Sequence, residues 1–121
     1  MKLRIKGNSI RIRVTQSEIS SLAEKGEIRE SIQFPGKALS YLLRVSDQTS
    51  LTAVMESDSI VIEIPGELAK QWTSTDMITI AGSQSIDSGD LQILVEKDFK
   101  CLDERINEDE TDLFPNPKQE C

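Results

Sequence analysis

The 121-residue sequence has no histidine, only two cysteines, and aromatic residues at 4%. Without histidine, the chain lacks the side chain that most often serves as a general base or a zinc ligand. The cysteines, Cys101 and Cys121, lie near the end of the chain and form no Cys-x-x-Cys pair. Glycine-rich phosphate loops and nucleophile elbows are also absent from the sequence. We therefore expect a protein that is not an enzyme and that uses no cofactor.

Long apolar runs are missing as well. No segment approaches the ~20 apolar residues that a membrane helix needs. Residues 1–6 alternate apolar with basic side chains, which does not fit the apolar block of a signal peptide. Apolar residues make up 37% of the chain and charged residues 29%, as in soluble globular domains. These observations predict a cytoplasmic protein without a membrane partner.

Charge is distributed unevenly along the chain, whose net charge is −7. Residues 1–50 carry a net charge of +4, residues 51–100 carry −6, and residues 101–121 carry −5. The first thirteen residues contain five basic side chains and no acidic one. The overall charge disfavours nucleic acid as a partner of the whole surface, whereas the asymmetry marks the beginning of the chain as a candidate binding face.

The first fifty residues predict two hairpins separated by a helix. Apolar residues alternate with basic ones over residues 2–14, with a turn at residues 7–8, which is typical of a half-buried hairpin. Thr15 followed by Glu18 fits a capping box, so a helix should begin near residue 16. Gly26 should end that helix. Two more alternating segments follow, on either side of a Pro-Gly turn.

The same pattern returns fifty residues later. Ile10 matches Ile60, Ile12 matches Ile62 and Leu22 matches Trp72, although Glu30 against Ile80 breaks the correspondence. Chance alignment of short strands is the alternative explanation. A ββαββ unit of this size cannot close its own core, but two units can. The sequence therefore predicts an α+β fold, a β-barrel built from two ββαββ repeats. Its expected parts are one domain over residues 1–98, with repeats at 1–50 and 51–98, and an acidic, proline-containing extension over residues 99–121.

Two resemblances accompany this pattern. The segment Gly7-Asn8-Ser9 followed by Ile10–Val14, and the segment Ile62–Pro65 followed by a short helix, resemble the AbrB/MazE family of swapped-hairpin proteins. That resemblance implies interleaved hairpins, so that this chain would form a pseudo-dimer by itself. Thr15 stands where that family often has proline. The whole chain, including the tail over residues 114–117, is similar to a family of small conserved bacterial proteins of unknown function.

The AbrB/MazE resemblance implies DNA contacts on the first hairpin. The positions that match are Arg4, Lys6, Asn8 and Arg13. Arginine and lysine suit phosphate and guanine, and asparagine suits adenine. The second hairpin departs from this pattern, because acidic residues at positions 56, 58 and 63 would repel phosphate. The alternative is that the basic residues form the solvated face of an amphipathic strand.

The acidic tail permits several interpretations. Two thiolates and nearby carboxylates could hold zinc, but the ligand spacing of a zinc or calcium site is absent, and we assign no metal ligand. A disulfide between Cys101 and Cys121 is possible but not required. A polar extension anchored by Phe114 is the simpler interpretation. The tail could also dock on the basic hairpin and screen it from partners.

The sequence as a whole favours a non-enzymatic cytoplasmic binding or accessory protein with an unidentified protein partner. One alternative is an AbrB/MazE-like DNA-binding or antitoxin-like regulator that acts through the first hairpin. The other is a metal-binding protein that uses the cysteines and carboxylates of the tail.

Overall fold

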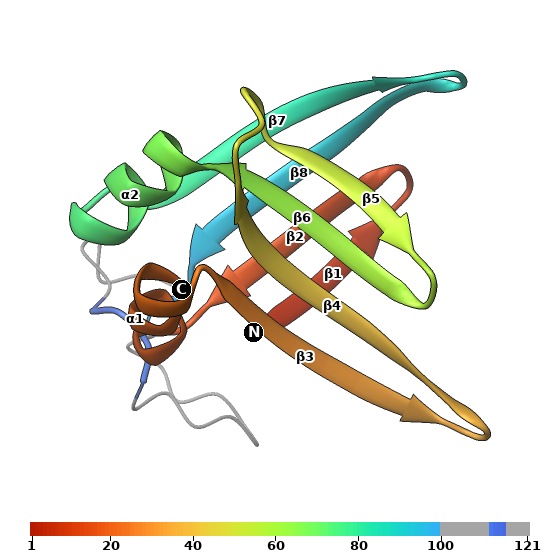
Figure 1. The fold of residues 1–121 in the computed structure, drawn as a ribbon, viewed down its shortest axis with the longest axis horizontal. Helices are drawn as coiled ribbons and strands as arrows, with labels where there is room; N and C mark the ends of the chain where they lie inside the picture. The colour runs from red at the N-terminus through yellow and green to blue at the C-terminus, as the bar shows by residue number, and fades with distance from the viewer. Residues whose placement is uncertain (100–111, 116–121) are drawn as a thin grey trace.

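The two halves of the chain contain the same order of elements: strand, strand, helix, strand, strand (Figure 1). The structure is a computed structural model that describes residues 1–99 and 112–115. The first half contains β1 at Lys2–Lys6, β2 at Ser9–Val14, α1 at Gln16–Lys25, β3 at Glu27–Phe34 and β4 at Lys37–Ser46. The second half contains β5 at Thr52–Glu56, β6 at Ser59–Pro65, α2 at Gly66–Ser74, β7 at Thr79–Ile86 and β8 at Gly89–Lys97.

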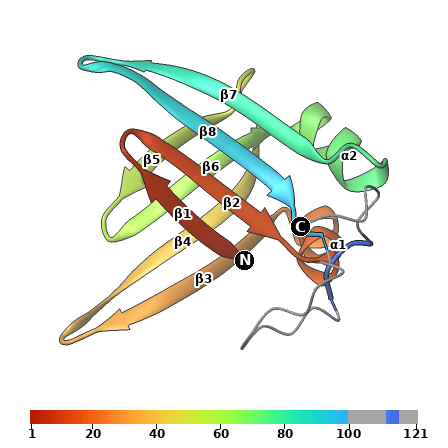
Figure 2. The same cartoon turned by 180° about the vertical axis from the view of Figure 1, so that it is seen from behind.

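The strands form two four-stranded sheets, and each sheet takes one hairpin from each half of the chain. The first sheet has the order β1-β2-β8-β7, and the second has the order β3-β4-β6-β5. Figure 2 shows the first sheet, in which the hairpin from the beginning of the chain lies beside the hairpin from residues 79–97. The central pairs, β2 with β8 and β4 with β6, are parallel. Each four-stranded sheet therefore requires strands from both halves of the chain.

The two sheets remain separate, so the prediction of a β-barrel is wrong. The fold is α+β with two sheets and two helices in the described residues. Where β5 approaches β7, the backbone N–H of Ala53 donates to Oε1 of Gln84 at 2.8 Å. Near β1 and β3, the α-amine of Met1 donates to Glu18 and Glu30 at 2.6 and 2.8 Å. Side chains thus bridge the sheet edges where a closed barrel would need a backbone ladder.

Helix α1 begins and ends where the sequence predicts. The Thr15 hydroxyl accepts a hydrogen bond from the backbone N–H of Glu18, and the Glu18 carboxylate accepts one from the N–H of Thr15 at 2.9 Å. This is the predicted capping box. Gly26 follows the helix with a φ of 78°, and its N–H donates to the carbonyl of Leu22 at 2.8 Å. Glycine suits this position because other residues rarely adopt a positive φ.

Helix α2 directs Trp72 into the core. It follows Pro65, which makes no side-chain capping bond. Ala69 and Trp72 are the buried residues of the helix, and Trp72 is 0% exposed. The indole Nε1–H donates to the carbonyl of Ile78 at 3.0 Å, so the polar atom of this large side chain is satisfied. Trp72 is therefore a core residue.

The core lies between the inward faces of the sheets and is closed at one end by the helices. Both helices lie at that end, whereas all four hairpin turns lie at the opposite end (Figure 1). The central strands supply its apolar residues in alternation. These residues are Ile10, Ile12, Val14, Leu43, Ile62, Ile64, Ile93 and Val95. No helix in residues 1–99 and 112–115 covers the end that carries the turns.

Residues 112–115 pack beside helix α1 and the end of β8. Leu113 is 6% exposed, and the N–H of Phe114 donates to the carbonyl of Asp98 at 2.8 Å. The ring centroids of Phe114 and Phe99 lie 5.5 Å apart. Phe114 packs against the core, as expected for an anchor, and Leu113 is a second anchor that the sequence did not indicate. The division into a domain over residues 1–98 and an extension over residues 99–121 stays a prediction.

Candidate nucleic-acid interface

Basic side chains gather on the outward face of β1 and β2. In β2 the buried residues alternate with Arg11 and Arg13. The antiparallel register places Arg4 opposite Arg11 and Lys2 opposite Arg13, and opposed residues share one face of a sheet. We call this surface the basic face, and its residues are Lys2, Arg4, Lys6, Arg11 and Arg13. Lys2 and Arg11 were not among the predicted site residues, although their alternation with apolar neighbours could have identified them.

The turn that shapes this hairpin has a counterpart in the second half. Gly7 has a φ of 56°, which favours glycine. Fifty residues later, Ser57 adopts a φ of 54° in the turn between β5 and β6. The sequence did not reveal this correspondence, because a serine rarely adopts such a conformation. The two hairpins therefore have similar turns despite different residues.

Acidic neighbours neutralise only part of the basic face. Oε1 of Glu96 lies 2.7 Å from Nε of Arg13 and 3.8 Å from Nε of Arg11. Lys2 is 3.1 Å from Oδ2 of the buried Asp98. In residues 1–99 and 112–115, neither Arg4 nor Lys6 forms an ion pair.

The pairing of Arg4 with Arg11 has a cost. Like charges directly opposite one another in a sheet repel, which lowers stability. Arg4 is exposed, so an anionic ligand can reach it and relieve this repulsion. Among the four predicted site residues, Arg4 and Lys6 are therefore the most accessible to an anionic ligand.

Asn8 has a structural role that the sequence did not indicate. Its side-chain amide donates to the carbonyl of Asp90 at 2.8 Å, and its own carbonyl accepts from the N–H of Gln92 at 3.1 Å. These bonds tie the β1-β2 turn to the β7-β8 hairpin of the other half. Asn8 thus has one amide N–H already engaged by the other half of the chain. Its assignment as a base-contacting residue stays a prediction.

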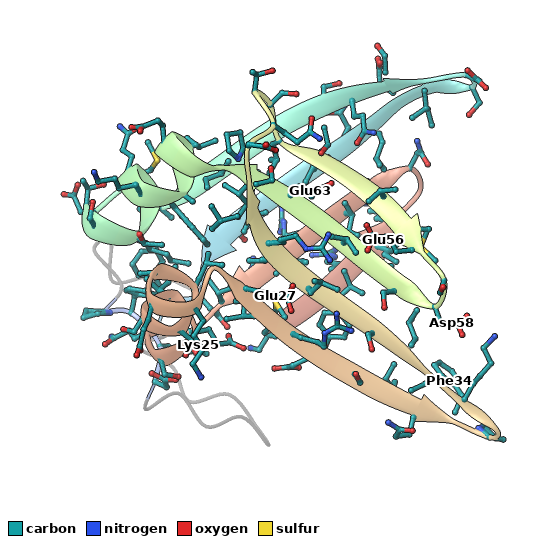
Figure 3. All side chains as sticks on the ribbon, viewed as in Figure 1. Lys25, Glu27, Phe34, Glu56, Asp58 and Glu63 are labelled. Atoms are coloured by element: carbon teal, nitrogen blue, oxygen red, sulfur yellow. The ribbon has the colours of Figure 1, made fainter. Side chains whose placement is uncertain are left out.

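The corresponding face of the second sheet carries mixed charge. Figure 3 shows Glu27, Glu56 and Glu63 on strands of this sheet. Arg44 lies among them, with 3.4 Å from Nε to Glu27 and 3.4 Å from a guanidinium nitrogen to Glu56. The hydrogen bond to Glu56 raises the pKa of Arg44. The cation is therefore already paired, and a polyanion has one favourable sheet face, not two.

A second polar cluster surrounds the α-amine of Met1. Burial opposes the charge of the amine, but its bonds to Glu18 and Glu30 outweigh that effect and raise its pKa. Burial also opposes the charge of Glu30, but bonds from the amine and from Tyr41 lower its pKa. The Tyr41 hydroxyl donates to Glu30 at 2.9 Å, and burial followed by this bond raises its pKa to about 12. The groups satisfy one another, which makes the cluster a structural link between the start of β1 and the second sheet.

An open groove of about 850 Å³ lies between α2 and β7. Its lining includes Glu67, Lys70 and several hydroxyl side chains. Within residues 1–99 and 112–115 there is no cluster of three carboxylates or thiols that could hold a metal ion. Cys101 and Cys121, on which the metal and disulfide interpretations depend, lie outside the described residues.

The described part of the tail contacts helix α1, not the basic face. The carbonyl of Asp112 accepts from the N–H of Gln16 at 3.0 Å, and the carbonyl of Leu113 accepts from Nε2 of Gln16 at 2.9 Å. The acidic residues at positions 103–110 lie outside the described residues, so the idea that they screen the hairpin stays a prediction.

In the described part of the chain, no helix combines the length and apolar character required to span a membrane. Comparison with curated proteins and with solved structures finds no match. A family model matches residues 1–118, which is nearly the whole chain and includes both sheets, both helices and the anchor at residues 112–115. The resemblance to AbrB/MazE proteins is not reproduced by this match. The chain belongs to DUF7009, a family of unknown function.

Proposed function

We propose that this protein is a non-enzymatic binding protein that holds nucleic acid by its phosphate backbone on the basic face. The observation that carries the proposal is the exposed pair Arg4 and Lys6, which has no ion pair in the described residues and lies beside Arg11. Alternate residues of a strand are ~6.7 Å apart, so the cations of β1 form a regular row. A regular row of cations suits a regularly charged polymer such as a nucleic-acid strand.

The charge distribution determines which sheet the nucleic acid approaches. The second sheet presents Glu27, Glu56 and Glu63 on its outward face, and these carboxylates repel phosphate. The ligand therefore approaches the first sheet. Because Glu96 already pairs with Arg13, we expect only two to four phosphate contacts. The affinity is then modest, strongly dependent on salt, and weakly dependent on base sequence.

We further propose that the halves are repeats of one swapped-hairpin unit of the AbrB type. Three observations support this: the shared order of elements, the parallel pairing of hairpins from opposite halves, and the similar turns at Gly7 and Ser57. A solved structure in which residues 1–50 superpose strand for strand on residues 51–97 is the expected result. Different paths of the two backbones would reject the proposal.

Fluorescence anisotropy with a labelled mixed-sequence duplex, measured over a series of salt concentrations, tests the nucleic-acid function. We expect binding at low salt and a slope of log K against log salt of roughly −2 to −4, from −0.9 per phosphate contact. Labelled single-stranded DNA and RNA of equal length identify the preferred form of nucleic acid. Failure of all three ligands to bind at low salt would reject the proposal.

A matched pair of variants locates the interface. Arg4→Gln with Lys6→Gln removes two positive charges from the basic face, and Lys25→Gln with Lys70→Gln removes two exposed positive charges from the helices. The first pair should weaken binding at least tenfold. It should also make the slope of log K against log salt shallower by about 2, which corresponds to the loss of about two phosphate contacts. The second pair should change affinity less than twofold. Equal losses from both pairs would mean that binding follows net charge and not the basic face.

A further inference from the structure

Exposed apolar side chains lie at the end of the molecule that carries the hairpin turns, where the hairpins diverge from one another (Figures 1 and 2). Ile5 and Met55 are each 61% exposed, Ile32 and Phe34 are each 50% exposed, and Ile86 is 38% exposed. Each of them lies at or near the end of a strand that leads into a turn (Figure 1). Isolated exposed apolar residues are common, but five at one end of a small domain require an explanation.

These residues belong to the inward faces of their sheets. Ile5 lies opposite Ile10, and Met55 lies opposite Ile60 in the register, which continues the pattern of the buried core. The apolar pattern therefore runs beyond the region that the facing sheet and the helices cover. At the helix end, by contrast, core residues such as Trp72 are fully buried. We call the end that carries the hairpin turns the open end. Its inward-facing side chains are apolar like those of the core, but they remain exposed.

A small cavity lies between the β1-β2 and β5-β6 turns. Its volume is about 200 Å³, and Ile5, Ile10, Ala53, Met55, Ile60 and Leu91 form most of its wall. It is below the ~300–1,000 Å³ of typical small-molecule sites, and no charged residue lines it. A macromolecular surface is therefore a better occupant than a small ligand.

Charges around this end identify the kind of surface that fits. The two turns of the first half carry Lys6 and Lys37, whereas the two turns of the second half carry acidic residues. The acidic residues are Glu56, Asp58, Asp87 and Asp90. Lys37 and Asp58, which are 67% and 58% exposed, already pair at 3.1 Å between neighbouring turns. The open end thus has a basic half and an acidic half with apolar residues between them.

We propose that the open end is the contact surface of a homodimer, in which two copies of this chain meet turn to turn. A two-fold rotation about the line that divides the basic half from the acidic half sets each basic half against the acidic half of the second copy. The second copy and a nucleic acid then compete for Lys6. Such a self-complementary surface is what a two-fold interface requires. It also covers Ile5, Phe34 and Met55 in both copies. A typical interface of about 800 Å² per partner would use roughly a tenth of the 7767 Å² surface.

Sedimentation velocity of the full chain over a concentration series tests the dimer. The expected result is a concentration-dependent shift from the 13.5 kDa chain to twice that mass, which weakens as salt is raised. A monomer at every concentration would overturn the proposal. A species larger than a dimer would also overturn it, because a closed two-fold contact ends at two copies.

Two serine substitutions locate the contact. Met55→Ser removes an exposed apolar side chain from the open end and should raise the dimer dissociation constant at least tenfold. Ile78→Ser removes another exposed side chain, 39% exposed, which precedes β7 next to the helix end, and should leave the constant unchanged. A circular dichroism spectrum and a melting curve that agree with those of the wild type establish that each variant is folded. If both substitutions change the dissociation constant equally, or if Met55→Ser does not change it, the open end is not the dimer contact.

Discussion

The carboxylate of Asp112 accepts hydrogen bonds from both the hydroxyl and the backbone N–H of Ser17, a residue 95 positions earlier in the chain. Ser17 lies in the first turn of α1, where unpaired N–H groups and the helix dipole favour a negative charge. Asp112 thus links residues 112–115 to helix α1, and the neighbouring Leu113 is buried beside it.

Replacing this carboxylate should destabilise the protein at neutral pH. Asp112→Asn keeps the shape of the side chain but removes the charge, and we expect a loss of about 0.3–1 kcal/mol in unfolding free energy. The bonds from Ser17 lower the pKa of Asp112. The stabilisation is therefore present above the unfolded pKa of about 3.9 and disappears as the pH falls through the lower folded value.

Urea unfolding at pH 7 and at successively lower pH measures this effect. The difference between wild type and Asp112→Asn should shrink as the pH falls. Asp47→Asn is the matched control, because it removes one exposed acidic charge far from α1 in the chain. Equal losses from the two substitutions at pH 7 would contradict the proposed link between Asp112 and the helix.

Glycine at position 57 should stabilise the protein. Ser57 has a φ of 54°, a conformation that costs a residue with a Cβ roughly 1–2 kcal/mol. Ser57→Gly removes this strain, although glycine also makes the unfolded chain more flexible, so the expected gain is about 0.5–1 kcal/mol. Gly7→Ala introduces the same strain in the first hairpin and should have the opposite sign. Chemical unfolding measures both variants, and a loss from Ser57→Gly would contradict the prediction.

Tyr41 should titrate well above a free tyrosine. It is the only tyrosine, so tyrosinate absorbance during an alkaline titration reports this residue alone. We expect a pKa of about 12 in the folded protein. Because folding favours the neutral phenol, stability falls as the pH rises from about 10, the unfolded value.

Glu30→Gln tests the cause of this shift. The substitution removes the carboxylate to which Tyr41 donates, so the pKa of Tyr41 should fall, while burial keeps it above its ordinary value. Trp72 fluorescence over the same pH range establishes that the protein remains folded. An unchanged Tyr41 pKa in this variant would show that Glu30 does not contribute.

The two halves should unfold together. Trp72, the only tryptophan, lies in the helix of the second half, whereas circular dichroism reports all strands and helices. Because β2 pairs with β8 and β4 pairs with β6, loss of one half removes the sheet partners of the other. We expect the two signals to give the same midpoint in urea, as a cooperative transition requires. An earlier fluorescence transition would mean that the second half unfolds by itself.

Features that depend on neighbouring residues were predictable from the sequence. Alternation in residues 2–14 gave the first hairpin, and Thr15 with Glu18 gave the beginning of α1, because strand and cap patterns repeat over a few residues. The outward position of Arg4 and Arg13 follows from the same alternation.

Features that depend on distant residues were not predictable. Whether the two sheets join into a barrel depends on the contact between β5 and β7, where Ala53 bonds to the side chain of Gln84. The structural role of Asn8 depends on its bond to the carbonyl of Asp90. The mismatch between Glu30 and Ile80 also has a tertiary cause, since Glu30 binds the amine of Met1. Likewise, a Cβ on Gly82 would approach the Cβ of Leu51 to 3.2 Å, which explains why a glycine interrupts the apolar pattern there. Each of these contacts joins segments that no local pattern relates.

The parallel pairing of β2 with β8 has a consequence for synthesis of the protein. Residues 9–14 leave the ribosome early, but their sheet partner at residues 92–97 follows more than seventy residues later. Until then, the first hairpin and its apolar face remain without their native neighbour, so the nascent chain is exposed to misassociation with other chains. The first sheet can therefore form only after residue 97 has been made, whereas the second sheet needs only residues 27–65.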